Sequence, residues 1–223
     1  MSVEGMMTLR VGDAAPAFEA AMVTKDGVVR LADYVGRAPL FLNFFRGLHC
    51  PFCRRAMAQL HAAERQLRDV GVETLVVIMT PRERAQRYFR YRPTTLEVAS
   101  DPQIATFRRY GVPQIMVTED EDDWPKVSMT SFSTFRINPT GELDEPMTVA
   151  EAAEVLNKMD GYVETPEEVA AVESLPPPLD GHFMIDRGGV VRWIEIEASD
   201  GPEDFGKLPN LDSILAAGRA LSG

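Results

Sequence analysis

The chain has only two cysteines, and they stand two residues apart in a Cys-Pro-Phe-Cys run at positions 50 to 53. The short apolar run before them, residues 39–45, is typical of a buried strand. After them, apolar residues recur at steps of four and three over residues 56–70, as in an amphipathic helix. A thiol in the first turn of a helix faces unpaired N–H groups and the positive end of the helix dipole, which lower its pKa. Because Cys50 and Cys53 can also close to a disulfide, the pattern predicts thiol redox chemistry.

Three other interpretations of the pair are less favoured. The cysteines could be two buried core residues that happen to lie close in sequence. A structural zinc ion would need two more ligands, and the chain offers only His49, His61 and His182 and no second cysteine pair. A permanent structural disulfide that closes so small a ring would reduce the entropy of the unfolded chain only slightly. We therefore expect no metal, and since no phosphate loop or flavin motif is present, no organic cofactor.

Length and composition favour one globular domain. The chain has 223 residues and is 45% apolar, which is enough to bury a core as a single domain with a large insertion. Residues 1–5 lack the features of a signal peptide, and no apolar run approaches the length that spans a bilayer. We therefore expect a cytoplasmic protein without a membrane partner, in which a Cys-X-X-Cys pair is cycled.

The acidic charge of the chain is concentrated in one segment. The net charge is −11, and residues 115–178 carry 15 acidic against three basic residues, so the remainder is close to neutral. This balance argues against a nucleic-acid partner. Around the thiols the chain is instead basic, with Arg46, Arg54 and Arg55. Arginines in the first turn of a helix oppose its dipole, so Arg54 and Arg55 need a nearby anion, which a thiolate could supply, unless they are simply solvated.

Strands alternate with helices along most of the chain. This order predicts an α/β fold with a central mixed sheet, flanked by helices and connected by right-handed crossovers. The expected elements are a hairpin at 17–20 and 28–31, strands at 73–79 and 96–99, helices at 81–90 and 102–110, a hairpin at 183–186 and 190–194, and a helix at 209–221.

The pattern changes over residues 113–178, which we interpret as an acidic, partly helical insertion. Residues 119–123 are all acidic and predict a solvated loop. Thr148 can cap a helix through residue 159, and Thr165 can cap a second one. We expect this insertion to be a cover or docking surface that is not part of the redox core.

The element order and three motifs resemble a known family. The motifs are Phe-Phe-Arg-Gly-Leu-His-Cys-Pro-Phe-Cys at 44–53, Gly-Asp-Ala-Ala-Pro-Ala-Phe at 12–18, and His-Phe-Met-Ile-Asp-Arg-Gly-Gly-Val-Val-Arg-Trp at 182–193. Over residues 10–112 and 180–221 the chain resembles the alkyl hydroperoxide reductase/thiol-specific antioxidant (AhpC/TSA) family, in particular its peroxiredoxin-like branch. The resemblance implies one thioredoxin-like domain over residues 1–223. It also implies a peroxide or disulfide substrate and an external dithiol reductant from the thioredoxin or glutathione system, with a homodimer as an open possibility.

The resemblance leaves the attacking cysteine open. The Pro-X-X-X-Thr-X-X-Cys segment of typical peroxiredoxins places Arg46 at the proline, Cys50 at the threonine and Cys53 at the peroxidatic cysteine. The family's second active-site arginine falls on Asp180. The missing threonine and arginine weaken the case for a fast peroxidase, since those groups orient the peroxide. A thioredoxin-like reading reverses the roles, so that Cys50 attacks and Cys53 resolves.

We expect Cys50, Cys53, Arg46 and His182 to form the catalytic site of a thiol-dependent oxidoreductase. His182 would open the strand that faces the thiols and could act as a general acid, although a lone histidine there is more often structural. A protonated His49 would lower the pKa of Cys50. The alternative function is an interaction or redox-sensing module without turnover, which a thiol pKa near the ordinary value would favour.

Overall fold

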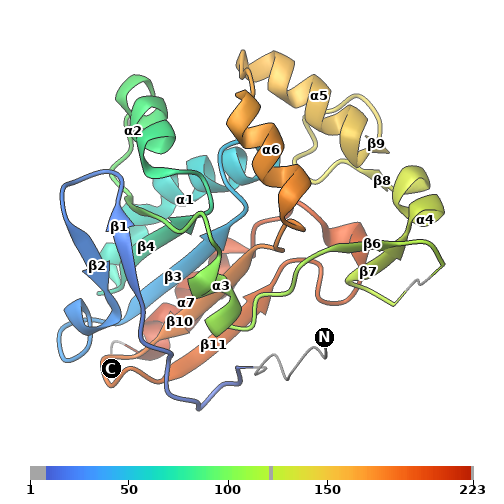
Figure 1. The fold of residues 1–223 in the computed structure, drawn as a ribbon. Coiled ribbons are helices and arrows are strands. Elements are labelled where there is room, and N and C mark those ends of the chain that lie inside the picture. The colour runs from blue at the N-terminus through green and yellow to red at the C-terminus, as the bar shows by residue number, and fades with distance from the viewer. Residues whose placement is uncertain (1–8, 121–122, 222–223) are drawn as a thin grey trace.

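A seven-stranded mixed sheet forms the centre of the molecule (Figure 1). The computed structural model describes residues 9–120 and 123–221, so the expectation about residues 1–5 lies outside the described residues. Strands β3, β4 and β5 are parallel, and antiparallel strands flank them on both sides. The strand order is β11, β10, β3, β4, β5, β1, β2. Their bounds are β1 (Glu19–Met22), β2 (Val28–Arg30), β3 (Leu40–Phe45), β4 (Glu73–Ile78), β5 (Glu97–Ser100), β10 (Gly181–Ile185) and β11 (Val191–Ile196).

Helices cover both faces of the sheet. They are α1 (Pro51–Asp69), α2 (Arg82–Tyr91), α3 (Ala105–Arg109) and α7 (Leu211–Leu221). Helices α1 and α7 lie on one face and α3 on the other (Figure 1). Side chains of β3 alternate between the two faces: Phe41 and Phe45 join the cluster under α1, while Leu40, Leu42 and Phe44 join the opposite cluster. No helix in the described part of the chain is long and apolar enough to cross a membrane.

The predicted α/β architecture is confirmed, with small shifts in element bounds. The largest shift concerns the helix expected at 102–110, because α3 begins only at Ala105. Ile104 before it is left-handed, with φ of 47°. The Asp101 carboxylate accepts the N–H groups of Ala105 at 3.1 Å and Thr106 at 2.6 Å, and so caps the helix at the later position.

The insertion between α3 and β10 contains more structure than the sequence predicted. The two expected helices are present, and Thr148 forms the predicted cap. The insertion consists of β6 (Met116–Thr118), β7 (Lys126–Ser128), α4 (Met129–Thr134), β8 (Arg136–Ile137), β9 (Met147–Thr148), α5 (Val149–Asp160) and α6 (Pro166–Ser174). Residues 119 and 120 are exposed loop, as predicted for the acidic run, and residues 121–122 lie outside the described residues.

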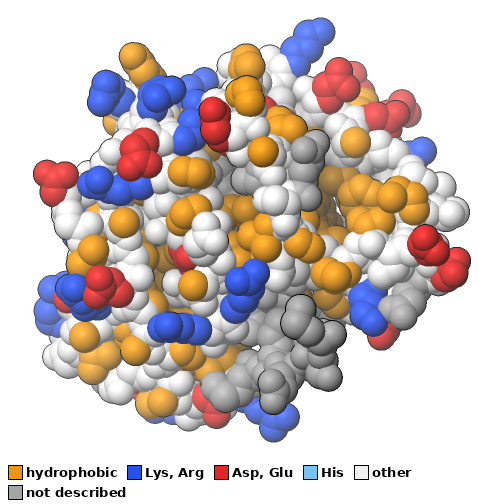
Figure 2. Space-filling view, viewed as in Figure 1, with side chains coloured by type: hydrophobic (Ala, Val, Ile, Leu, Met, Phe, Trp, Pro, Cys, Tyr) orange, Lys and Arg blue, Asp and Glu red, His pale blue; other side chains and the backbone are white. Residues whose placement is uncertain are grey.

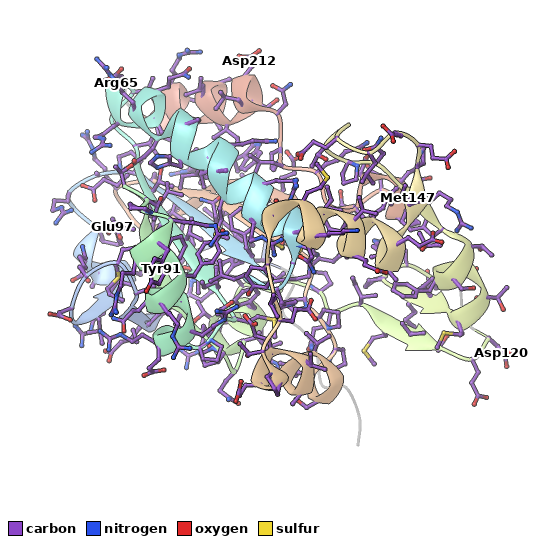
Figure 3. All side chains as sticks on the ribbon, turned by 90° about the horizontal axis from the view of Figure 1, so that it is seen from above. Arg65, Tyr91, Glu97, Asp120, Met147 and Asp212 are labelled. Atoms are coloured by element: carbon purple, nitrogen blue, oxygen red, sulfur yellow. The ribbon has the colours of Figure 1, made fainter. Side chains whose placement is uncertain are left out.

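The insertion projects from one end of the molecule. In the view from above, Asp120 and Met147 mark that end, and Arg65 and Asp212 lie at the other (Figure 3). On the face shown in Figure 2, hydrophobic side chains gather around a hollow between α6 and α4.

The expectation that the insertion stands apart from the redox core is wrong. Apolar side chains of the insertion, including Ala152 and Leu156 of α5, belong to the same buried cluster as Cys50 and Cys53. Leu60, on the buried face of α1, belongs to it as well. The insertion therefore completes the apolar core on the α1 side of the sheet.

Candidate active site

The two cysteines lie where the chain passes from β3 into α1. Cys50 is the N-cap residue of α1, and its sulfur accepts the N–H of Cys53 at 3.2 Å. Both are free thiols; Cys50 is 7% exposed, whereas Cys53 is fully buried. The turn before them needs a glycine, because Gly47 has φ of 129° and a Cβ there would lie 2.6 Å from the Thr80 hydroxyl. Of the two cysteines, Cys50 is the more accessible residue, which is the arrangement expected in the thioredoxin-like reading.

The pKa of Cys50 is lowered from 9.0 to about 6. Burial alone would raise it, but hydrogen bonds from Cys53 and the positive charge of Arg46 outweigh burial. A thiol with this pKa is largely thiolate at neutral pH, which is the nucleophilic form.

Behind Cys53 lies a buried ionic cluster made by Arg46, Asp180 and Glu197. The Arg46 guanidinium pairs with Glu197, and the backbone N–H of Arg46 donates to Asp180 Oδ1 at 3.1 Å. The Glu197 carboxylate also accepts the backbone N–H groups of Asp180 at 2.9 Å and Gly206 at 2.5 Å. The carboxylates of both acids are therefore fixed by hydrogen bonds although they are buried.

Cys53 donates its thiol proton to Asp180, whose two carboxylate oxygens each lie 3.6 Å from the sulfur. Burial, together with the neighbouring Cys50 and Asp180, raises the pKa of Cys53 well above its ordinary value. Burial also raises the pKa of Asp180. The pair thus has one acidic thiol, Cys50, and one protonated thiol beside a carboxyl group.

Asp180 and Glu197 were missed as site residues by sequence reasoning. The signal at Asp180 is only that it occupies the position of the family's second arginine. Glu197 follows directly after β11 and gave no signal beyond being an acidic residue at the end of an apolar strand. An arginine next to an apolar strand end, as at Arg46, is the one local sign that a buried carboxylate should be sought.

The structure does not bring His182 into hydrogen-bonding contact with either thiol. It lies inside β10, where its Nδ1 pairs with Asn43 Oδ1 at 2.9 Å, and its Nε2 has no hydrogen-bond partner among the described residues. Burial lowers its pKa to about 4. Its expected role as a general acid therefore has no geometric support, and a pairing with Asn43 is the role that the contacts show.

His49 is neutral at physiological pH and does not supply the positive charge expected of it. Burial and the charge of Arg46 lower its pKa to about 4. His61 lies further along α1 against Thr94 and Thr95.

The anion that Arg54 and Arg55 require is Asp160 and not a thiolate. Asp160, at the end of α5, bonds Arg54 at 2.5 Å and Arg55 at 3.0 Å. Arg55 also pairs with Glu142 at 2.8 Å. These ion pairs, which we call the Asp160 clamp, fasten the insertion to the first turn of α1.

A central sheet with a dithiol between β3 and the start of α1, and with helices on both faces, defines a thioredoxin-like fold. The model of the AhpC/TSA family matches residues 11–194. The chain therefore belongs to the AhpC/TSA family, and this membership supports a thiol-dependent redox function. No curated protein sequence matches the chain.

Solved structures of redox proteins share this fold at low sequence identity. A peroxidoxin BcpB from Mycobacterium tuberculosis is 16% identical with a TM-score of 0.57, and covers 96% of this chain and 98% of its own. Peroxiredoxin Q from Xanthomonas campestris is 12% identical with a TM-score of 0.58, at 98% and 100% coverage. A protein described as a thiol:disulfide interchange protein DsbE, from Chlorobium tepidum, is 19% identical with a TM-score of 0.56, at 97% and 100% coverage.

Proposed function

We propose that this protein is a thiol–disulfide oxidoreductase in which Cys50 attacks the disulfide of a protein partner and Cys53 resolves the mixed disulfide. The observation that carries the proposal is the asymmetry of the pair. Cys50 is the more accessible residue and its pKa is about 6, whereas Cys53 is fully buried and protonated beside Asp180. One sulfur is thus suited to attack from outside and the other to close the ring from inside.

The cycle balances as two thiol–disulfide exchanges. The Cys50 thiolate bonds to one sulfur of the partner disulfide, and the other sulfur leaves as a thiolate that takes a proton from water. Cys53 then attacks Cys50, which releases the second partner thiol and leaves a Cys50–Cys53 disulfide. An external dithiol reduces this disulfide, and we propose a cytoplasmic thioredoxin or glutathione system as its source.

Asp180 is placed to take the proton of Cys53 in the second step. Its oxygens are the hydrogen-bond acceptors of that thiol, 3.6 Å from the sulfur. A carboxylate whose pKa is raised by burial is a better proton acceptor than an exposed one. Arg46 holds it in position through its backbone N–H.

The carboxylates around Arg46 favour a disulfide over a peroxide as the substrate of this protein. The Arg46 guanidinium is occupied by Glu197, with Asp180 at 3.7 Å, so its donors are not free to orient a peroxide. The position of the family's threonine hydroxyl is occupied by Cys50 itself. Peroxide is the second candidate oxidant, and family membership together with the small exposed area of Cys50 favours it.

Trapping with single-cysteine variants tests the proposal. A partner carrying a disulfide should form a stable mixed disulfide with the Cys53→Ser variant and none with Cys50→Ser, read by non-reducing electrophoresis and mass spectrometry. If Cys50→Ser traps the partner at the parental rate, Cys53 is the attacking residue.

A turnover assay distinguishes a disulfide from a peroxide as the oxidant, and either of them from an interaction or redox-sensing module without turnover. Hydrogen peroxide, an organic hydroperoxide and a protein disulfide are compared with thioredoxin and glutathione as reductants. We expect the highest turnover with the protein disulfide. Absence of turnover with all three would favour a sensing or interaction module.

A further inference from the structure

An apolar cavity lies in the insertion next to the redox site. Its volume is about 200 Å³. Its walls include Ile115, Trp124, Val127, Phe132, Phe135 and Phe205. Its lining comes from the residue before β6, the β6–β7 loop, β7, α4, the start of α5 and the segment after β11. Hydrophobic side chains surround a hollow on this side of the molecule (Figure 2).

Phe205 connects this cavity to the dithiol. The ring of Phe205 lies over the Arg46 guanidinium, 4.4 Å from Cζ to the ring centroid. It also packs edge-on against Phe52, which stands between the two cysteines, with ring centroids 6.1 Å apart. A group in the cavity would therefore contact the same ring that covers the arginine of the active site.

The cavity wall contains a polar group that a ligand could satisfy. The indole Nε1 of Trp124 is buried and has no acceptor among the described residues. A buried donor without an acceptor is costly, so an incoming carbonyl oxygen would be bound favourably there. Large apolar side chains are also exposed beside the cavity on β6 and α4, namely Met116, Val117 and Met129.

The loop between β6 and β7, which supplies the wall residue Trp124, carries exposed acidic residues. Glu119 and Asp120 follow β6, and Asp123 directly precedes Trp124. These carboxylates favour positive charges on whatever binds. An apolar cavity of roughly 150 Å³ holds one benzene-sized group, which is the size of a single large side chain and less than the roughly 300 Å³ or more of a typical small-molecule site.

We propose that the cavity and the acidic β6–β7 loop form a docking site for the polypeptide that exchanges disulfides with Cys50. The partner presents one large apolar side chain flanked by lysine or arginine. Its side chain enters the cavity, a backbone carbonyl accepts the Trp124 indole N–H, and its cations face Glu119 and Asp120. This proposal rests on the proposed function for the identity of the partner, but the docking itself involves no redox step.

Peptide binding to a chain without thiols tests the docking site separately from the chemistry. The Cys50→Ser/Cys53→Ser variant is titrated by calorimetry with the peptides Lys-Lys-Phe-Lys-Lys, Lys-Lys-Ser-Lys-Lys and Glu-Glu-Phe-Glu-Glu. We expect the first to bind at least about tenfold more tightly than either of the others, because only it offers both the apolar group and the positive charge.

Two variants and a charge-matched control locate the binding. Glu119→Lys/Asp120→Lys should weaken binding of the basic peptide about fivefold, and the effect should vanish at high salt. Asp69→Lys/Glu154→Lys makes the same change of charge at exposed positions in α1 and α5, outside the β6–β7 loop, and should leave binding unchanged. Trp124→Phe keeps an aromatic wall but removes the unpartnered donor, so it should weaken binding about threefold without loss of thermal stability.

Several results would overturn the proposal. Equal binding of the three peptides, binding that both charge-reversal variants weaken equally, or binding of a small apolar alcohol but of no peptide would each do so. So would concentration-dependent self-association through this face, seen by sedimentation and abolished by Trp124→Phe. Failure of the trapping experiment alone, with selective peptide binding intact, would count against the redox assignment and not against the docking site.

Discussion

At the scale of single residues, the one thiol proton of Cys53 has two acceptors, the Asp180 carboxylate and the Cys50 sulfur, and its donation to Cys50 stabilises the Cys50 thiolate. Interaction with the Cys53 side chain is the largest of the effects that lower the pKa of Cys50, ahead of the charge of Arg46. The two cysteines are therefore linked before any oxidation occurs. Each one sets the reactivity of the other.

When Cys53 is replaced, the pKa of Cys50 should depend on whether the new side chain can still donate a hydrogen bond. In Cys53→Ser a hydroxyl can still donate, so we expect the pKa of Cys50 to stay close to about 6. In Cys53→Ala the donor is gone and the pKa should rise toward its ordinary value. The ultraviolet absorbance of the thiolate as a function of pH measures both. Identical titrations of the two variants would show that the side-chain hydrogen bond has no role.

Asp180→Asn should slow the resolving step and spare the attack. The amide fills the same space but cannot take the proton of Cys53, and loss of a general base costs about 10²-fold to 10⁴-fold in rate. We expect the mixed disulfide to accumulate in rapid-quench experiments while the rate of its formation changes little. Asp200→Asn, at an exposed position, is the control. An unchanged lifetime of the mixed disulfide would remove Asp180 from the mechanism.

At the scale of elements, the Asp160 clamp fastens α5 to the start of α1. Burial would raise the pKa of Asp160, but hydrogen bonds from Arg55 and Arg54 hold it below its ordinary value. Since its folded-state pKa is depressed, the stability it contributes is present above its unfolded pKa and is lost as pH falls through the folded one.

Asp160→Asn should lower the free energy of unfolding by about 1 kcal/mol at neutral pH, a value reduced because Asp160 is partly exposed to solvent. The difference from the parent protein should begin to shrink below about pH 4, where Asp160 is protonated in the unfolded chain, and should continue to shrink until the folded-state carboxylate is protonated at lower pH. Denaturant unfolding at several pH values measures this. A difference independent of pH would mean that the charge of Asp160 is not what stabilises the protein.

The sequence predicted best those features that depend on neighbouring residues. The dithiol at a helix start, the alternation of strands and helices, and the Thr148 cap are all local patterns. The contacts that complete the site are not local: Cys53 and Asp180 are 127 residues apart, and Arg46 and Glu197 are 151 apart. For the same reason an arginine opposing the helix dipole predicted a nearby anion, but could not identify it as Asp160.

At the scale of the whole molecule, the insertion and the sheet share one buried cluster. Leu156 of α5 and Leu60 of α1 are both buried within it. We therefore expect Leu156→Ala and Leu60→Ala to destabilise the protein by similar amounts, about 2–5 kcal/mol each.

Both variants should unfold in a single transition, seen alike by calorimetry and by circular dichroism. A separate early transition in Leu156→Ala alone would show that the insertion unfolds independently. Deleting residues 115–178 should likewise unfold the protein, because it exposes the apolar face of α1.

β3 pairs with β10, which lies far behind it in the sequence, so the order in which the chain is synthesised has a consequence for the thiols. The ribosome adds Arg46 134 residues and Cys53 127 residues before Asp180, which directly precedes the β10 strand that pairs with β3. At about 5–20 residues per second, that interval lasts roughly 7 to 30 s. During this time the nascent chain carries the Cys53 thiol without its acceptor Asp180, although the groups that lower the pKa of Cys50, which are Cys53 and Arg46, are already present. The proton acceptor of the resolving thiol is thus added long after the thiol that it serves.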